Sequence, residues 1–136
     1  SAVWNTYDNG TRTDTGGHLH LRPRDMARIG QLALQRGQWN GTQLVSTAWM
    51  DASTRQHTAF DDGPTNGYGY LWWHGTLELA RGKVPFFFAN GAGGQYIFVV
   101  PALDLVAVFT GENYGNDTAA ARPYALLDEI AAAVTD

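Results

Sequence analysis

Apolar residues recur at helical spacing near both ends of the chain and in strand-like runs between them. After Pro23, which suits a first helical turn, apolar side chains recur every three or four positions until Gly37, a plausible stop. Ser46 suits the N-cap of a second, shorter helix. The pattern predicts helices over residues 23–36, 47–54 and, near the C-terminal end, from 119 or 123 to 134.

Some apolar side chains of these helices are expected to pack into a core. In the second helix the expected anchors are Trp49 and Met50. The last helix carries an apolar stripe that fits a helix lying on a sheet. The stripe consists of Leu126, Leu127, Ile130 and Val134.

Aromatic and aliphatic runs in the second half of the chain predict strands. They are nearly continuous in apolar residues, which is typical of strands covered on both faces. The predicted strands are residues 68–74, with 77–79 as a continuation or turn, then 84–88, and a hairpin of 96–100 and 105–109 turned at 101–104. Residues 1–4 suit a short strand or anchor, 5–17 and 56–67 read as loops, and 39–42 as a turn.

The order of these elements is two helices, several antiparallel strands and a covering helix. This order predicts an α+β fold, an antiparallel sheet covered by a C-terminal helix. No internal repeat or low-complexity tract divides the sequence, so residues 1–136 are expected to form a single domain.

Size and composition exclude several classes of function. The chain has 136 residues, 44% of them hydrophobic, enough for one domain with a core. Its formal net charge is −4, and no basic stripe favours nucleic acid. No apolar run is long enough for a membrane span, and the absence of cysteine excludes disulfides and thiolate chemistry but leaves the compartment open. The chain begins with Ser1 rather than Met, so we expect a processed product or a piece of a longer protein.

The run Asn90-Gly91-Ala92-Gly93-Gly94-Gln95 is the strongest candidate for a functional turn. Its three glycines let the backbone approach a ligand closely, and the apolar strand behind them would hold the N–H groups still. An oxyanion hole or anion-binding turn is built in this way. The alternative is a tight hairpin that only joins two strands.

Histidines and carboxylates are weaker candidates for a functional site. His18 and His20 lie on one side of an extended segment, but no third ligand is evident, so we expect no metal site and no cofactor. His57 and His74 are isolated and read as surface or hydrogen-bonded structural residues. The neighbouring carboxylates of Asp61 and Asp62 are expected to point apart.

Two further features leave structural and functional interpretations open. The five tryptophans favour core anchoring over a stacking platform for sugar, and of Trp72 and Trp73 one is expected to face the core and the other a cleft or helix. Residues 112–117 follow a strand end, where loops often line sites, but they also suit a connector capped by Asp117. No Gly-x-Ser-x-Gly and no Ser-x-x-Lys pattern supplies an activated nucleophile.

Several segments together resemble one family in order and spacing. Residues 16–30 (GGHLHLRPRDMARIG) resemble the GGL-x-x-(S/T)-x-RDLARFG segment of serine hydrolases of the class C β-lactamase type. The resemblance continues in that family's order across nearly the whole chain, and is closest to its 6-aminohexanoate-dimer hydrolase and esterase relatives. The further matching segments are 37–41, Val45, Trp49, 68–73, 90–95, 100–101 and 105–108.

The resemblance implies a partial active site within an incomplete β-lactamase-like α/β domain. The family's Ser-x-x-Lys and Tyr-x-Asn elements lie upstream of the matching region and are absent here. Its third element, Lys/His-Ser/Thr-Gly, would fall at Ala89-Asn90-Gly91, which departs from it at two positions. The resemblance then places one oxyanion donor at the N–H of Ala92, and we expect Gly93, Trp72 and Tyr114 to bind substrate.

We therefore expect the C-terminal part of a serine hydrolase acting on a small amide, ester or β-lactam-like substrate through an acyl-enzyme. An uncovered sheet edge and face would recruit the missing N-terminal segment or a second copy of the chain. One alternative is a non-catalytic ligand-binding or scaffold module with a groove lined by Trp72, Trp73 and Tyr114. Another is a proteolytic fragment without an independent role.

Overall fold

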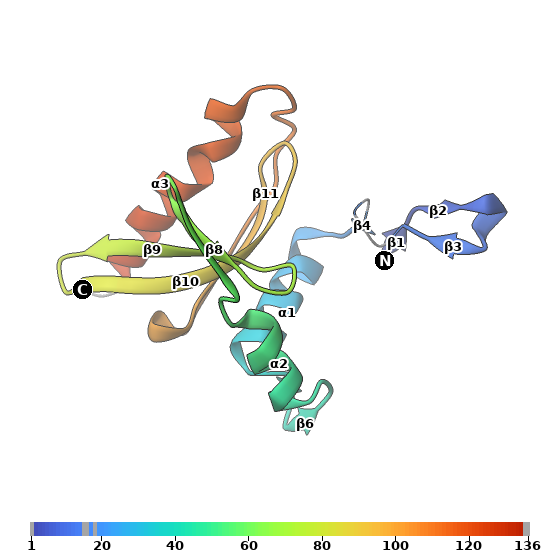
Figure 1. Cartoon of the computed structure of the whole chain (residues 1–136), viewed down its shortest axis with the longest axis horizontal. Helices are drawn as coiled ribbons and strands as arrows, with labels where there is room; N and C mark the ends of the chain where they lie inside the picture. Colours follow the sequence, from blue (N-terminus) through green and yellow to red (C-terminus); the bar gives the residue numbers. More distant parts are fainter. Residues whose placement is uncertain (1, 15–16, 18, 135–136) are drawn as a thin grey trace.

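The computed structural model describes residues 2–14, 17 and 19–134 and is built on a six-stranded antiparallel sheet. The strands lie in the order β12-β11-β10-β9-β8-β7, so each pairs with its neighbour in sequence (Figure 1). Their bounds are β7 Thr58–Asp62, β8 Thr65–Tyr68, β9 Trp73–Leu79, β10 Gly82–Gly91, β11 Gln95–Val100 and β12 Leu105–Phe109. The helices are α1 Pro23–Leu34, α2 Thr47–Thr54 and α3 Asp117–Ala133. The predicted α+β class, with an antiparallel sheet and a C-terminal helix, is confirmed.

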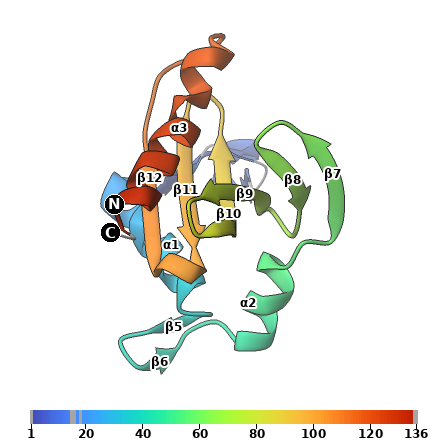
Figure 2. The ribbon, with the colours of Figure 1, turned by 90° about the vertical axis from the view of Figure 1, so that its left-hand side faces the viewer.

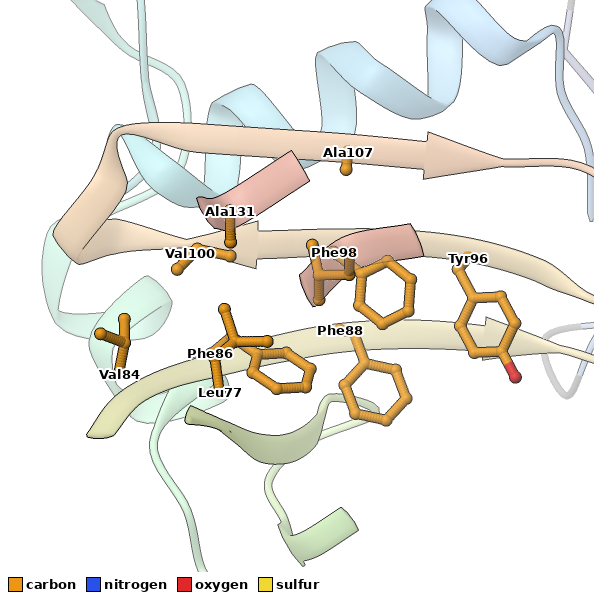
Figure 3. Close-up of a cluster of buried hydrophobic side chains, with 10 residues drawn as sticks. Leu77, Val84, Phe86, Phe88, Tyr96, Phe98, Val100, Ala107 and Ala131 are labelled. Atoms are coloured by element: carbon orange, nitrogen blue, oxygen red, sulfur yellow. The ribbon is translucent and has the colours of Figure 1, made fainter. Parts of the chain in front are cut away.

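Alternate side chains of β11 enter two different cores, as its continuous apolar run predicts. On one face, Phe98 and Val100 pack with Phe88 and with Leu127 of α3. Figure 3 shows these aromatic rings along β10 and β11, with Tyr96 at the end of the cluster. On the other face, a second cluster joins the sheet to α1 and α2 (Figure 2). Its buried members are Met26, Ala33, Met50, Phe87, Ile97 and Val99.

The close approach of α1 to the sheet depends on a glycine in the middle of the helix. A Cβ added at Gly30 would lie 2.6 Å from Val106 Cγ1 and 2.8 Å from Ile97 Cγ2. These distances are too short for non-bonded carbon atoms, so any side chain would push α1 away from β11 and β12. The packing requirement outweighs the ordinary cost of glycine inside a helix.

Local sequence signals correctly predicted the start of α2 and the turn at residues 39–42. The Ser46 hydroxyl accepts a hydrogen bond from the Trp49 N–H at 3.3 Å, so α2 begins where the N-cap predicts. The turn at Asn40 and Gly41 has positive φ at both residues and joins the two-residue strands β5 Gln38–Trp39 and β6 Thr42–Gln43.

Two segments that were predicted to be loops contain hairpins, so these two predictions were wrong. Within residues 56–67 the structure has β7 and most of β8, and β7 is exposed along its whole length, so it has no apolar pattern to detect. Residues 5–17 contain the paired strands β2 Thr6–Tyr7 and β3 Arg12–Thr13 around the short 3₁₀ turn η1 Asp8–Gly10. The Asn9-Gly10 dipeptide was the signal that could have revealed this turn. Strand β1 Val3–Trp4 pairs with β4 Leu19–His20, and this region projects from the sheet (Figure 1).

Two predictions about buried side chains were also wrong. Met50 is buried as expected, but Trp49 lies on the outer side of α2 with 56% of its surface exposed. On α3, the buried residues are Pro123, Leu127 and Ala131, whereas the rest of the predicted stripe is exposed. Those exposed residues are Leu126, Ile130 and Val134.

The edge strand β12 has a neighbour on one side only among the described strands. Its two faces are covered, since α1 contacts one and α3 contacts the other. The 3₁₀ turn η2 Pro101–Leu103 joins it to β11, with Asp104 in the left-handed region. None of the helices in the described ranges has the length and apolar character needed to cross a bilayer.

Candidate functional site

The glycine-rich turn joins β10 to β11 at the end of the sheet. The strand ladder closes at the pair Gly91 and Gln95, and residues 92–94 form the turn itself. Gly93 and Gly94 have φ angles of +85° and +95°, a region that side chains with a Cβ rarely adopt. The turn conformation therefore explains why glycine occupies these two positions.

The loop that follows β12 holds the turn in place. The Asn113 N–H donates a hydrogen bond of 2.9 Å to the Gly93 carbonyl, and the Gln95 side-chain amide donates to the Gly111 carbonyl. The Tyr114 ring lies against Gly93, where an added Cβ would be 3.0 Å from its Cε1 atom. The backbone of the turn is thus held by this loop before any ligand arrives.

A pocket of about 310 Å³ lies between this turn, the 113–117 loop and the first turns of α3. Five of the six residues predicted for the site line it: Asn90, Gly91, Ala92, Gly93 and Tyr114. The remaining lining residues are Gly94, Tyr96, Asn113, Gly115, Asp117, Ala120 and Ala121. The turn therefore borders a cavity, which a hairpin that only joins two strands would not require.

The Ala92 N–H is available to a ligand. Ala92 lies in the turn, outside the strand ladder, and its side chain is exposed. Among the described residues, no backbone hydrogen bond takes up its N–H. A free donor on an immobilised backbone beside a pocket is the arrangement that an oxyanion site needs.

The structure does not bring Trp72 to this pocket. Its ring packs edge-on against Phe87, with centroids 5.2 Å apart, in the core cluster that includes α1. The neighbouring Trp73 packs against Phe88 in the opposite cluster. Both rings thus pack against the two cores, in agreement with the interpretation of the tryptophans as core anchors, and neither lines the pocket.

The floor of the pocket is polar but uncharged. Tyr96 is buried there, and its hydroxyl shares a hydrogen bond with that of Tyr124 on α3. Burial is the main cause that raises the pKa of both hydroxyls above their ordinary value. The hydrogen bond between them lowers the pKa of Tyr96 by a smaller amount, whereas the charge of Tyr96 and the same hydrogen bond raise the pKa of Tyr124 further. Both side chains therefore stay protonated at neutral pH.

The sequence reasoning named Tyr114 and raised the 112–117 loop as a candidate, but it missed how this loop supports the site. Asn113 fixes the turn through its backbone, and no side-chain pattern reports a backbone hydrogen bond. The predicted cap at Asp117 was one residue off, because the Asn116 side chain accepts from the Ala119 N–H at 3.0 Å. Asp117 lies instead in the first turn of α3 and lines the pocket.

The other candidate groups lie elsewhere. His18 is outside the described residues, and His20 is exposed on β4. The His57 ring stacks on Tyr70 and its Nε2 lies 2.7 Å from the Ala52 carbonyl, so it is a hydrogen-bonded structural residue as expected. Asp61 and Asp62 are exposed neighbours on β7. Within the described ranges, no group of three or more His, Cys, Asp or Glu residues is arranged to hold a metal ion.

Of the comparisons with known proteins, the one with solved structures gives matches. No protein-family model matches the sequence, and no curated protein matches it. Among solved structures 19 chains match. One of them, a "putative 6-aminohexanoate-dimer hydrolase" from Bacillus anthracis, aligns with 88% of this chain at 26% sequence identity and a TM-score of 0.64. The match covers 32% of that protein, so this chain spans about a third of its length. The likeness supports a hydrolase-like fold.

Proposed function

We propose that this chain forms one wall of the active site of a serine hydrolase that cleaves linear amides or esters through an acyl-enzyme. The observation that carries the proposal is the Ala92 N–H, free and immobilised at the mouth of a pocket. When a nucleophile attacks a carbonyl, negative charge develops on the carbonyl oxygen, and a preorganised N–H donor stabilises it. The structural neighbour named as a hydrolase supports the same reaction class.

Each residue of the turn has a distinct part in this reaction. Asn90 and Gly91 end β10 and set the direction of the next peptide group. The Ala92 N–H donates to the oxyanion, while Gly93 and Tyr114 form the wall against which the substrate lies. Because the donor is a backbone group, it does not depend on the Lys/His-Ser/Thr-Gly triplet that residues 89–91 lack.

The nucleophile and its base must come from elsewhere. We place them in an upstream segment of a longer chain, because this chain has no Ser-x-x-Lys and spans about a third of the neighbour. The surfaces proposed to receive that segment are the outer edge of β12 and the exposed face of α3 formed by Leu126, Ile130 and Val134. An edge strand offers unpaired N–H and C=O groups, and an apolar helix face gains from burial.

Reconstitution tests the proposal. The 136-residue chain is mixed with an upstream segment that carries Ser-x-x-Lys, and hydrolysis of a chromogenic ester is measured. Ala92→Pro removes the N–H and should lower kcat by about 10²–10³-fold, the usual cost of losing one oxyanion donor. Ala92→Ser keeps the N–H and is the matched control, with activity near that of the parent. Unchanged turnover in a folded Ala92→Pro mixture would overturn the assignment.

A non-catalytic ligand-binding module is the second candidate. It is favoured by one observation, namely that this chain by itself forms a pocket of about 310 Å³ beside the glycine turn. Saturable binding of a small amide by the chain alone, with no ester hydrolysis in a well-folded mixture, would support this role over the hydrolase.

A further inference from the structure

Four asparagines in the chain are followed directly by glycine, and the Asn-Gly dipeptide is chemically labile. They are Asn9, Asn40, Asn66 and Asn90. The glycine nitrogen, once it loses its proton, attacks the Cγ atom of the asparagine side chain, because glycine has no Cβ to obstruct the approach. A bond between this nitrogen and Cγ forms, the bond between Cγ and Nδ2 breaks, and ammonia leaves. Water then opens the resulting succinimide ring to aspartate or isoaspartate, so water is the only co-reactant.

Two of these asparagines are held within the six-stranded sheet. The attack requires the asparagine side chain to fold back onto the next backbone nitrogen, so a peptide group that is fixed by its neighbours reacts slowly. The Asn66 Nδ2 donates a hydrogen bond of 2.8 Å to Thr76 Oγ1, and the Asn66 carbonyl accepts one of 2.8 Å from the Gln56 side chain. Asn90 and Gly91 both lie in the ladder with β11. Deamidation at either asparagine therefore requires strands of the sheet to separate.

Asn40 is exposed, but its hairpin is tied to a helix. Together with Gly41, which is also exposed, it forms the turn between β5 and β6. At the base of this hairpin the Gly37 N–H donates to the Leu32 carbonyl of α1 at 2.8 Å, and the Leu44 N–H donates to the Gly37 carbonyl at 2.9 Å. Because α1 is packed on the sheet, this turn opens less often than an unsupported one.

Asn9 and Gly10 are exposed at the turn of the β2–β3 hairpin, which forms a separate two-stranded sheet and projects from the rest of the chain (Figure 1). Two-stranded hairpins are only marginally stable in water. Asp8 and Asn9 both have positive φ, +51° and +56°, which residues with a Cβ rarely adopt. The Thr11 N–H closes the turn with a long bond of 3.3 Å to the Asp8 carbonyl, and its hydroxyl donates to the same carbonyl at 2.8 Å. This strained turn opens more readily than the peptide groups at the other three asparagines.

We propose that Asn9 is the principal site of spontaneous deamidation in this chain, followed by Asn40, with Asn66 and Asn90 protected by the sheet. Aspartate at position 9 places a second carboxylate beside Asp8 and makes the formal net charge one unit more negative than −4. Isoaspartate also adds a methylene group to the backbone, which the short turn between β2 and β3 does not accommodate. The modification therefore loosens the projecting hairpin and leaves the glycine turn of the site intact. The inference is independent of the proposed function.

Peptide mapping tests this order, because trypsin places each of the four asparagines in a different peptide. Cleavage after arginine and lysine, except before proline, gives peptides 1–12, 37–55, 56–81 and 84–136. The folded chain is incubated at mildly alkaline pH, and mass spectrometry with fragmentation follows the conversion of each asparagine over time. A parallel incubation in urea gives the rate of each site in the unfolded chain. We expect folding to slow the reaction less than about tenfold at Asn9 and more than about a hundredfold at Asn66 and Asn90.

Three variants link the reaction at Asn9 to opening of its hairpin. The Tyr7 hydroxyl donates a hydrogen bond of 2.8 Å to Asp14 Oδ2, so Tyr7→Phe should speed the reaction about two- to tenfold in the folded chain and leave it unchanged in urea. Tyr70→Phe removes the hydroxyl of another exposed tyrosine and should leave the rate as in the parent. Asn9→Gly suits the positive φ and should leave peptide 1–12 unmodified at this position.

Each outcome bears on the hairpin alone. A slower reaction at Asn9 than at Asn40, or similar rates at all four sites in the folded chain, would overturn the inference. An unchanged rate in folded Tyr7→Phe would do the same, because opening of the hairpin would then not limit the reaction. Ester hydrolysis does not enter these measurements, so the role of the Ala92 N–H is decided separately by reconstitution.

Discussion

At the scale of single residues, two glycines allow the cost of a positive φ to be measured separately from a side-chain contact. Gly93 and Gly41 both have positive φ, +85° and +80°, but only at Gly93 would a new Cβ meet the Tyr114 ring. Each glycine-to-alanine change should lower the free energy of unfolding by about 1–2 kcal/mol, the cost of a left-handed residue with a Cβ. Urea denaturation measures this loss.

Only Gly93→Ala should move the Tyr114 ring. The ring is largely exposed, so it can swing away from the added methyl group, and its NMR resonances should shift. In Gly41→Ala nothing lies within 4 Å of the new Cβ, so these resonances should stay in place. Identical Tyr114 spectra in the two variants would show that the ring does not rest on Gly93.

His74 should make stability depend on pH. Its Nε2 is buried without a hydrogen-bond partner among the described residues, and this burial, with a smaller effect of His57, lowers the pKa of the His74 imidazole. The unfolded chain keeps the ordinary value near 6.5, so below about that pH it binds more protons than the folded chain. The free energy of unfolding should therefore fall as pH drops from about 6.5 to the lowered folded-state value.

Urea denaturation between neutral and acidic pH measures this slope. His74→Gln removes the titrating group and should flatten it. His20→Gln, which removes an exposed imidazole on β4, is the control and should leave the slope as in the parent. A slope that survives in His74→Gln would assign the acid sensitivity to another group.

Some residues of the candidate site could be predicted from the sequence, and others could not. The glycine run marks its own turn, because only certain backbone conformations require glycine. Of the two aromatic residues expected to bind substrate, Tyr114 lines the pocket and Trp72 does not, and substrate binding by Tyr114 stays a prediction. The tight connection before β9 determines the face of the sheet on which the Trp72 ring lies. In this connection the Gly69 N–H donates a hydrogen bond to the Trp72 carbonyl, and Leu71 has a φ of +66°. No alternation pattern reports such a connection.

At the scale of elements, α3 buries a different face from the one its sequence suggests. Its buried positions, Pro123, Leu127 and Ala131, are spaced four residues apart. Leu127 and Ala131 belong to the aromatic core, in which Figure 3 labels Ala131. Leu127→Ala should destabilise the chain by about 2–5 kcal/mol, because it opens a cavity in a fully buried site. Leu126→Ala, one residue away and 43% exposed, should cost less than about 0.5 kcal/mol.

Thermal and urea denaturation of these two variants decide which face is inside. Comparable losses in both would contradict the packing of α3. The sequence could not settle the choice, since α3 is apolar on two adjacent faces and the larger side chains favour the wrong one. The small residue Ala131 allows a closer approach to the core that holds Phe88 and Phe98 than a row of leucines would.

Elements with strong local signals were predictable, and elements that depend on their neighbours were not. Helices α1 and α2 carry Pro23, Gly37 and the Ser46 cap, and their bounds agree with the structure to within two residues. Strand β7 has no such signal, because all five of its residues are exposed and its conformation comes from pairing with β8. Such a strand forms because it pairs with a neighbouring strand, and not because of its intrinsic strand propensity.

At the scale of the whole molecule, the proposed docking surface consists of two features that are uncovered in the described part of the chain. The outer edge of β12 carries backbone groups without a partner strand among those described. The second is the exposed face of α3, with Leu126, Ile130 and Val134 four residues apart. Apolar faces and strand edges of this kind are sites of association. The proposed occupant is the upstream segment, and a second copy of the chain is the competing one.

The double variant Leu126→Glu and Ile130→Glu tests that surface. Both side chains are exposed, so the isolated chain should keep its fold and its unfolding free energy. Binding to the upstream segment should weaken at least tenfold in Kd, since each carboxylate would be buried without a partner at the interface. Isothermal titration calorimetry measures this change, with Glu129→Gln on the same helix as the control that should bind normally.

Sedimentation velocity of the chain alone distinguishes the two occupants. A dimer that the double variant abolishes would show that a second copy covers α3. A stable monomer whose affinity for the upstream segment is the same in parent and double variant would remove α3 from the interface. Only the edge of β12 would then remain as the docking surface.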